Sequence, residues 1–225
     1  MNRHIAVVGL GEFGQRVARL LIEGRTDRHL LSAAPPHEIF HRLAHGGAEA
    51  VMVVLWRHSP AWCDEFDTLA FQTGTRWLPV VMEHPRLRVG PLISPGQGPC
   101  HRCFERRRIQ HDPHPEAAAA LAAAYDAAPD RGPTGYLPHH ARLAAHLAEV
   151  TMSAHDSAGR LTTLGLNAGK TESRRVRACH GCTRCSSSPL PYDGSLAPAR
   201  LLPHLPVIKT ASSNTTAGQP GGRHD

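Results

Sequence analysis

Two Cys-x-x-Cys pairs, Cys100/Cys103 and Cys182/Cys185, are separated by the 78 residues 104–181. Each pair presents two thiolates from one tight turn, and two pairs complete the tetrahedral four-sulfur shell that suits Zn²⁺. Closing a loop of this length instead of ~18 residues costs only about 1.3 kcal/mol more, because loop entropy grows logarithmically. A structural zinc contributes ~10–16 kcal/mol. The pairs therefore predict one structural zinc site that fastens the C-terminal part of the fold to the rest.

Other uses of the cysteines remain open at this point. Cys179 or His180 would also suit as a ligand in place of one member of the second pair. Cys179, Cys182 and Cys185 have the x₂–x₂ spacing of some iron–sulfur proteins, although the fourth Cys-Pro of the ferredoxin pattern is missing. A dithiol redox pair is a third interpretation. The sixth cysteine, Cys63, is expected to be a buried, unreactive thiol.

A glycine turn follows the first apolar segment. Residues 4–9 (HIAVVG) predict a buried strand, and Gly9, Gly11 and Gly14 then form G-x-G-x-x-G before a helical pattern. This context is the one that a nucleotide-binding turn requires. An acidic residue should end the second strand ~20 residues later and hold the ribose. The segment RHLLSAAPP (28–36) has none, and Glu12 places a negative charge inside the turn, so ATP or NAD(P) binding is doubtful.

The remaining pattern alternates strands and helices, which predicts an α/β fold with a Rossmann-like, mostly parallel sheet over residues 4–98. We expect helix 138–155 to bury the face of Leu143, Leu147 and Val150. Residues 1–186 are predicted to form one domain, and residues 187–225, rich in Pro, Ser and Gly, a flexible tail. The predicted strands are 29–34, 48–57, the end of 68–84, and 87–96; the predicted helices are 38–45, 115–129 and 138–155; a hairpin is predicted to turn at 167–169.

Arginine explains most of the net charge of +6, with 23 arginines against two lysines. Arg102, Arg106, Arg107 and Arg108 gather beside Phe104, which raises the possibility of nucleic-acid binding. Zinc ribbons, however, usually place their cysteine pairs ~15–20 residues apart, so a solvated basic helix start or an acidic-peptide contact is favoured and nucleic acid is not. No apolar run approaches the ~18 residues of a membrane span, and the N-terminus is not a signal peptide. We therefore expect a cytoplasmic protein.

Four segments together resemble the ThiF-like (ubiquitin-activating-enzyme-like) superfamily: VVGLGEFG (7–14), VGPLISPGQGPCHRCFERRR (89–108), ARLAAHLAEV (141–150) and CHGCTRC (179–185). They are most similar to its ocin-ThiF-like branch, the partner proteins of azole-peptide cyclodehydratases. The resemblance implies zinc ligands at Cys100, Cys103, Cys182 and Cys185, and a glycine turn at Gly9, Gly11 and Gly14. It also implies a homodimer.

The resemblance implies a non-adenylating partner of a YcaO-type enzyme, which cyclises Cys, Ser or Thr of a ribosomal precursor peptide. Active adenylating members have an acidic pair and an Asn-x-x-Arg-Gln after the second strand, and residues 29–47 have neither. Many members of the branch also carry an N-terminal winged-helix module that grips the leader peptide, and this chain begins almost directly at its first strand. The alternative is a nucleotide-using enzyme, either an adenylyltransferase or an oxidoreductase, with His58, Asp64 or Glu83 as its acid or base.

Overall fold

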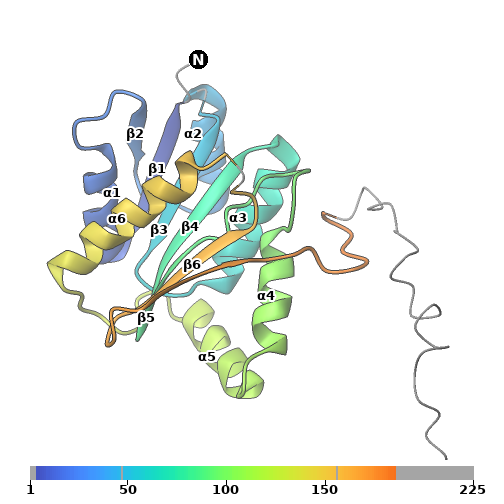
Figure 1. The fold of residues 1–225 in the computed structure, drawn as a ribbon. Helices are drawn as coiled ribbons and strands as arrows, with labels where there is room; N and C mark the ends of the chain where they lie inside the picture. Colours follow the sequence, from blue (N-terminus) through green and yellow to red (C-terminus); the bar gives the residue numbers. More distant parts are fainter. Residues whose placement is uncertain (1–3, 47, 156, 186–225) are drawn as a thin grey trace, which may run out of the picture. The chain divides into compact units, whose positions relative to one another are not determined.

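The computed structural model describes residues 4–46, 48–155 and 157–185 (Figure 1). The predicted tail, 187–225, lies outside the described residues. A seven-stranded sheet has the order β2-β1-β3-β4-β5-β6-β7. The strands are β1 (Ile5–Leu10), β2 (Arg28–Leu31), β3 (Ala50–Leu55), β4 (Arg76–Glu83), β5 (Arg86–Val89), β6 (Arg160–Gly165) and β7 (Thr171–Arg175). The helices are α1 (Gly11–Ile22), α2 (Pro36–Gly46), α3 (Pro60–Thr73), α4 (His101–Gln110), α5 (Pro115–Ala127) and α6 (Pro138–Ser153).

The first four strands form the parallel part of the sheet. β1 pairs with β2 and β3, and β3 pairs with β4, all in parallel register. Every residue of β3 is buried, as expected for a strand that helices cover on both faces. The predicted α/β class and the predominance of one strand direction are confirmed, since five of the seven strands run the same way.

The other end of the sheet is antiparallel, and here the prediction of a parallel sheet through residue 98 is wrong. Only His84 and Pro85 separate β4 from β5. A parallel neighbour needs a crossover of a dozen or more residues, so this connection permits antiparallel pairing alone. The strand predicted for 87–96 ends at Val89, and Leu92 and Ile93 form only isolated bridges.

Helices cover the parallel strands on both sides. α1 and α6 pack on one face, while α2 and α3 cover the other (Figure 1). α6 does not bury the predicted face, because Leu143 and Val150 are 41% and 48% exposed. It buries a row of small residues instead, which lets the helix lie close to α1: Ala141, Ala144, Ala145 and Ala148.

The hairpin predicted near residues 167–169 is confirmed. β6 and β7 pair antiparallel, and Gly169 has a φ of 63°, the left-handed conformation that such a turn needs. The Gly169 N–H donates to the Gly165 carbonyl at 2.8 Å. Among the helices of the described residues, none is long and apolar enough to cross a membrane.

Candidate functional site

The structure brings the two cysteine pairs together. The sulfur atoms of Cys100, Cys103, Cys182 and Cys185 all lie within 4.8 Å of one another. Cys100 Sγ is 3.7 Å from both Cys103 Sγ and Cys182 Sγ, and Cys103 Sγ is 3.4 Å from Cys185 Sγ. Two thiolates on a tetrahedral zinc, each ~2.3 Å from the metal, are ~3.8 Å apart, whereas a disulfide needs ~2.0 Å. The donor set and its spacing therefore fit a metal ion.

Each pair is held by a turn of the backbone. Cys100 is the N-cap of α4, and the Cys103 N–H donates to the Cys100 carbonyl at 3.1 Å. In the second pair, the Cys182 N–H donates to the Cys179 carbonyl at 3.2 Å, next to the left-handed Gly181. Burial alone would raise the pKa of Cys182, but backbone N–H groups of Cys185 and Arg184 lower it to about 6. Such a thiol is readily available as a thiolate ligand.

Cys179 and His180 lie outside the four-sulfur group. The Cys179 N–H donates to Cys103 Sγ at 3.2 Å, and the Cys179 thiol donates to the Cys103 carbonyl. Cys179 therefore supports a sulfur of the group through its backbone, as residues around metal ligands commonly do. His180 is exposed, and Cys63 is fully buried in α3.

Asp67 of α3 connects both cysteine pairs to the sheet, and sequence reasoning missed it. One carboxylate oxygen accepts hydrogen bonds from Trp77 Nε1–H in β4 and from the His101 N–H beside Cys100, both at 3.2 Å. The other oxygen accepts from Arg184 at 2.6 Å, within the second pair. Burial raises the pKa of Asp67, while these donors oppose the shift.

Arg184 makes further contacts with α3. Its guanidinium lies 3.3 Å from Asp64 and donates to Thr68 Oγ1 at 2.6 Å. The sequence does contain a sign of this contact, because Asp67 occupies the buried face of α3 with Cys63, Phe66 and Ala70. An aspartate among apolar positions at helical spacing indicates a buried partner, since an unpaired charge there would be costly.

The glycine turn is built by close packing. A Cβ added at Gly9 would meet the carbonyl oxygen of Gly14, and one at Gly14 would meet the carbonyl oxygen of Val54 in β3. Gly11 has a φ of +68°, and a Cβ there would meet the ring of Trp56. These contacts require glycine whether or not a nucleotide binds.

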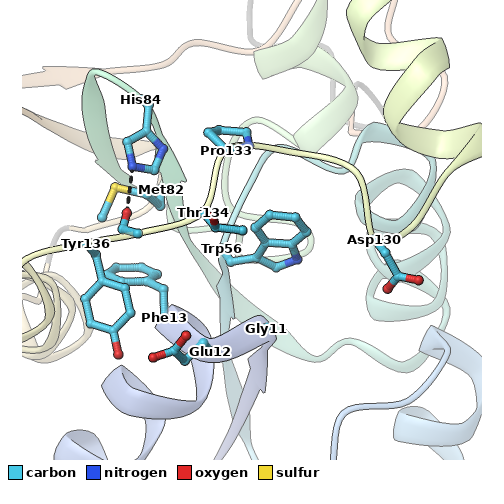
Figure 2. A pocket seen from close by; sticks show the side chains of 11 residues that line it. Gly11, Glu12, Phe13, Trp56, Met82, His84, Asp130, Pro133, Thr134 and Tyr136 are labelled. Carbon is cyan, nitrogen blue, oxygen red and sulfur yellow. Dashed lines mark hydrogen bonds between the residues drawn. The ribbon is translucent and has the colours of Figure 1, made fainter.

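A pocket of about 330 Å³ opens above the glycine turn, at the carboxyl ends of β1, β3 and β4 (Figure 2). This edge is where open α/β sheets bind their ligands. The Trp56 ring lies beside Gly11, and Glu12 and Asp130 supply carboxylates. No lysine or arginine occurs among the described residues that line the pocket. Its charge therefore opposes the phosphates that the N-terminus of α1 would otherwise attract.

Residues 128–137 form one wall of this pocket. His84 Nε2 lies 3.0 Å from the Gly135 carbonyl oxygen. The Tyr136 ring packs edge-on against the Phe13 ring, with 5.3 Å between the two ring centroids. Arg57 donates to the carbonyls of Tyr125 and Pro129, at 2.9 and 3.0 Å. The wall is thus held by His84, the residue after β4, and by Arg57, the residue after Trp56.

The candidate acids and bases, His58, Asp64 and Glu83, do not line the pocket above the glycine turn. Asp64 pairs with Arg102 at 3.0 Å. Glu83 pairs with the buried Arg88 at 2.7 Å, and His58 lies 3.5 Å from Glu83. Burial alone would raise the pKa of Glu83, but Arg88 and His58 hold it far below its ordinary value. These groups serve ion pairs within the fold.

Comparison with known proteins gives the fold relationship. No family model and no curated protein matches the sequence. The heterocyclase TruD superposes with a TM-score of 0.53 at 15% identity, over 81% of this chain and 27% of TruD. For E. coli MccB with AMPCPP and MccA the TM-score is 0.56 at 13% identity, over 82% of this chain and 66% of MccB. For a chain of the E. coli microcin synthetase McbBCD complex the TM-score is 0.57 at 12% identity, over 80% of this chain and 67% of the matched chain.

The matches differ in how much of each known protein they include. This chain spans about a quarter of the length of the heterocyclases that it matches, and about two thirds of the matched MccB and microcin synthetase chains. At 12–15% identity the likeness is one of fold. The chain shares the fold found in the heterocyclase TruD, in MccB and in the microcin synthetase complex.

Proposed function

We propose that this chain is a non-adenylating, ThiF-like partner or scaffold subunit in the biosynthesis of ribosomally made, modified peptides of the thiazole or oxazole type. In this role it assists a YcaO-type cyclodehydratase or a related modifying enzyme and contacts the precursor peptide. The fold shared with a heterocyclase and a microcin synthetase supports a role in peptide modification. Its resemblance to the ocin-ThiF-like branch supports the more specific role.

The lining of the pocket above the glycine turn is the observation that carries the non-adenylating part of the proposal. ATP would bring several negative charges to a surface that carries Glu12 and Asp130 and no described lysine or arginine. Like charges at such distances repel, and the helix N-terminus alone offsets only a fraction of this cost. Trp56 packs against the turn at Gly11, where a nucleotide phosphate would need close access.

The four cysteines have a structural part in this proposal. They would hold Zn²⁺, whose four thiolate ligands leave no open position for a reacting molecule. Residues 179–185 would thereby be fastened to the N-terminal end of α4, beside the basic surface that its arginines form: Arg102, Arg106, Arg107 and Arg108. The metal supplies stability to this surface, and the chain's own side chains make the contacts with partners.

Reconstitution with a precursor peptide and a YcaO-type enzyme tests the function. Each azoline forms when a Cys, Ser or Thr side chain attacks the preceding amide carbonyl and one water is lost, so ring formation is counted by mass spectrometry. We expect rings with both proteins and ATP present, and few or none without this chain. ATP consumption by this chain with a peptide alone, giving an adenylated carboxylate, would overturn the proposal.

The alternative, a nucleotide-using enzyme, is favoured by one observation, namely a pocket at the carboxyl ends of parallel strands beside an intact glycine turn. Calorimetric titration of the zinc-loaded protein with Mg-ATP, NAD⁺ and NADPH separates the two. Micromolar binding of any one of the three would favour the enzyme. We expect no binding of any of the three.

A further inference from the structure

Beyond β5, where α4 packs, the antiparallel end of the sheet has one face that no helix of the described residues covers. Residues alternate between faces along each strand, and Leu87, Val89 and Leu164 point into the core against α6. Their neighbours on the opposite face line a groove of about 750 Å³, which α4 borders on one side. The strand residues on that face are Arg86, Arg88, Leu161, Thr163, Glu172 and Arg174.

The groove carries an excess of positive charge. Six arginine or lysine side chains line it against three carboxylates, so its net charge is +3 before His111 is counted. Glu172 is shared by Lys170 at 3.2 Å and Arg174 at 2.9 Å. Arg86 is exposed and forms no ion pair within the described part of the chain. Cationic groups therefore remain available to a ligand.

The base of the groove is rigid because its central arginine is fixed from three sides. Arg88 is 2% exposed, binds Glu83 at 2.7 Å and the Gly90 carbonyl at 2.6 Å, and lies 4.7 Å above the Phe104 ring. On the α4 side, Arg107 donates to the carbonyls of Arg177 and Ala178. These contacts fix the floor and one wall of the groove without a ligand, and the exposed Arg86, Lys170 and Arg174 supply the charges available to one.

We propose that this groove binds an extended acidic peptide segment, which lies over the face of β5–β7 and directs alternate carboxylates at Arg86, Lys170 and Arg174. β7 bounds the groove at one edge of the sheet, so an extended chain can enter the groove from that side. Its five residues span ~17 Å, enough for about five residues of a ligand. The source of the segment, a precursor peptide, rests on the function proposed above.

The chain's own C-terminal residues do not match this ligand in charge. Residues 186–225 contain two aspartates against Arg200, Lys209 and Arg223. A cationic segment gains nothing from a groove of net charge +3. The complementary partner is an acidic chain from another molecule.

Fluorescence anisotropy with the full chain tests the groove. The probe is a fluorescein-labelled peptide of about eight residues in which glutamate alternates with serine, and its counterpart carries glutamine in place of glutamate. We expect the acidic probe to bind at least tenfold more tightly than the neutral one. Binding should weaken as salt rises, because the Debye length falls from about 10 Å at 0.1 M to about 3 Å at 1 M.

The variant Arg86→Gln/Arg174→Gln removes two groove charges from exposed positions, and we expect it to weaken acidic-probe binding at least tenfold. The variant Arg16→Gln/Arg142→Gln is its matched control, since it loses the same charge from exposed positions on α1 and α6. The control should bind within twofold of the parent. Equal weakening by both variants would show that only the overall charge matters and would overturn the proposed groove site. Equal binding of the two probes would overturn it as well.

Two further results separate this proposal from others. A short oligothymidylate that displaces the acidic probe with higher affinity would show that the groove takes a phosphate backbone, and would overturn the peptide ligand. Ring formation in the reconstituted system is scored independently. If ring formation depends on the chain but the probe does not bind, the groove fails and the function stands. If the probe binds through Arg86 and Arg174 but no rings depend on the chain, the function fails and the groove stands.

Discussion

At the scale of single residues, Asp67 links parts of the fold that lie far apart in the sequence. Its two oxygens serve Trp77 in the sheet, the start of α4 and Arg184 in the second cysteine pair. A fully buried carboxylate that accepts three hydrogen bonds holds its neighbours in one arrangement. The two cysteine pairs are thus positioned partly by the protein itself.

Asp67→Asn should lower the free energy of unfolding by about 3 kcal/mol, because removal of the buried member of this ion pair leaves Arg184 with only the half-exposed Asp64 as an ionic partner. Arg184, whose side chain is 12% exposed, is the group that would be left. Asp64→Asn, one turn earlier, is the matched control. Asp64 is 45% exposed and also contacts Arg184, so the control should cost less than about 1 kcal/mol. Urea unfolding followed by circular dichroism measures both, and equal losses would contradict the role given to Asp67.

At the scale of elements, α6 shows that the size of the side chains decides which face of a helix is buried. The apolar positions Leu143, Leu147 and Val150 predicted a leucine-rich face, but the helix turns its alanines inward. Small side chains allow the helix backbone to come close to α1 and the sheet, and this close packing outweighs the burial of the larger side chains that stay outside. Spacing alone does not distinguish these two faces, because both repeat at helical intervals.

Ala144→Leu should destabilise the fold by about 1–3 kcal/mol, since added methyl groups must displace a well-packed neighbour. Ala144 is fully buried between α6 and the core. Leu143→Ala is the adjacent control at a residue 41% exposed, and it should change stability by no more than about 0.5 kcal/mol. Thermal unfolding of the two variants compares them directly. A larger loss for Leu143→Ala would mean that the other face carries the packing.

The pairing of β4 with β5 adds a pH dependence to stability. Glu83 has a folded-state pKa far below its ordinary ~4.3, so the unfolded chain takes up this proton first as the pH falls. The stabilisation from the Glu83–Arg88 pair is therefore complete well above pH ~4.3 and is lost progressively below it. Glu83→Gln should cost about 3 kcal/mol at neutral pH, because Arg88 stays buried. The difference in free energy of unfolding between Glu83→Gln and the parent protein should shrink toward pH ~3.

Urea titrations at neutral and acid pH measure this effect. Glu23→Gln, an exposed carboxyl after α1, serves as the control and should not change the pH profile. A parallel offset of the Glu83→Gln and parent curves at all pH values would contradict the assignment of the acid-labile stability to Glu83.

At the scale of the whole molecule, the sequence predicted the parallel strands, the hairpin and the meeting of the two cysteine pairs. These features follow from local signs: β-branched runs, a glycine at a left-handed turn, and repeated Cys-x-x-Cys spacing. The strand pattern did not predict the antiparallel end, because apolar runs leave the direction of β5 open and only the two-residue link after Glu83 decides it. Asp67, Trp56 and the groove on β5–β7 were missed because their roles depend on neighbours brought close only by the fold.

Metal removal should destabilise the molecule as a unit. We expect one Zn²⁺ per chain by elemental analysis, and a large loss of cooperativity in unfolding after chelation, because binding energy at such sites is folding energy. Cys182→Ser should lose the metal. Cys179→Ser is the matched control, since Cys179 lies outside the four-sulfur group and contributes chiefly its backbone N–H, and it should retain the metal. Retention by the first variant and loss by the second would exchange the roles of these cysteines.

The separation of the two cysteine pairs also sets an order on the making of the protein. Cys185 follows Cys103 by 82 residues, so a ribosome that adds ~5–20 residues per second needs on the order of 4–16 s to produce it. During that interval Cys100 and Cys103 lack the other two ligands, because β6, β7 and the second pair have not yet been synthesised. Residues 4–153 can pair and pack before the four sulfur atoms come together. A metal held by these four cysteines would therefore bind late in the folding of each nascent chain, after residues 4–153 have been made.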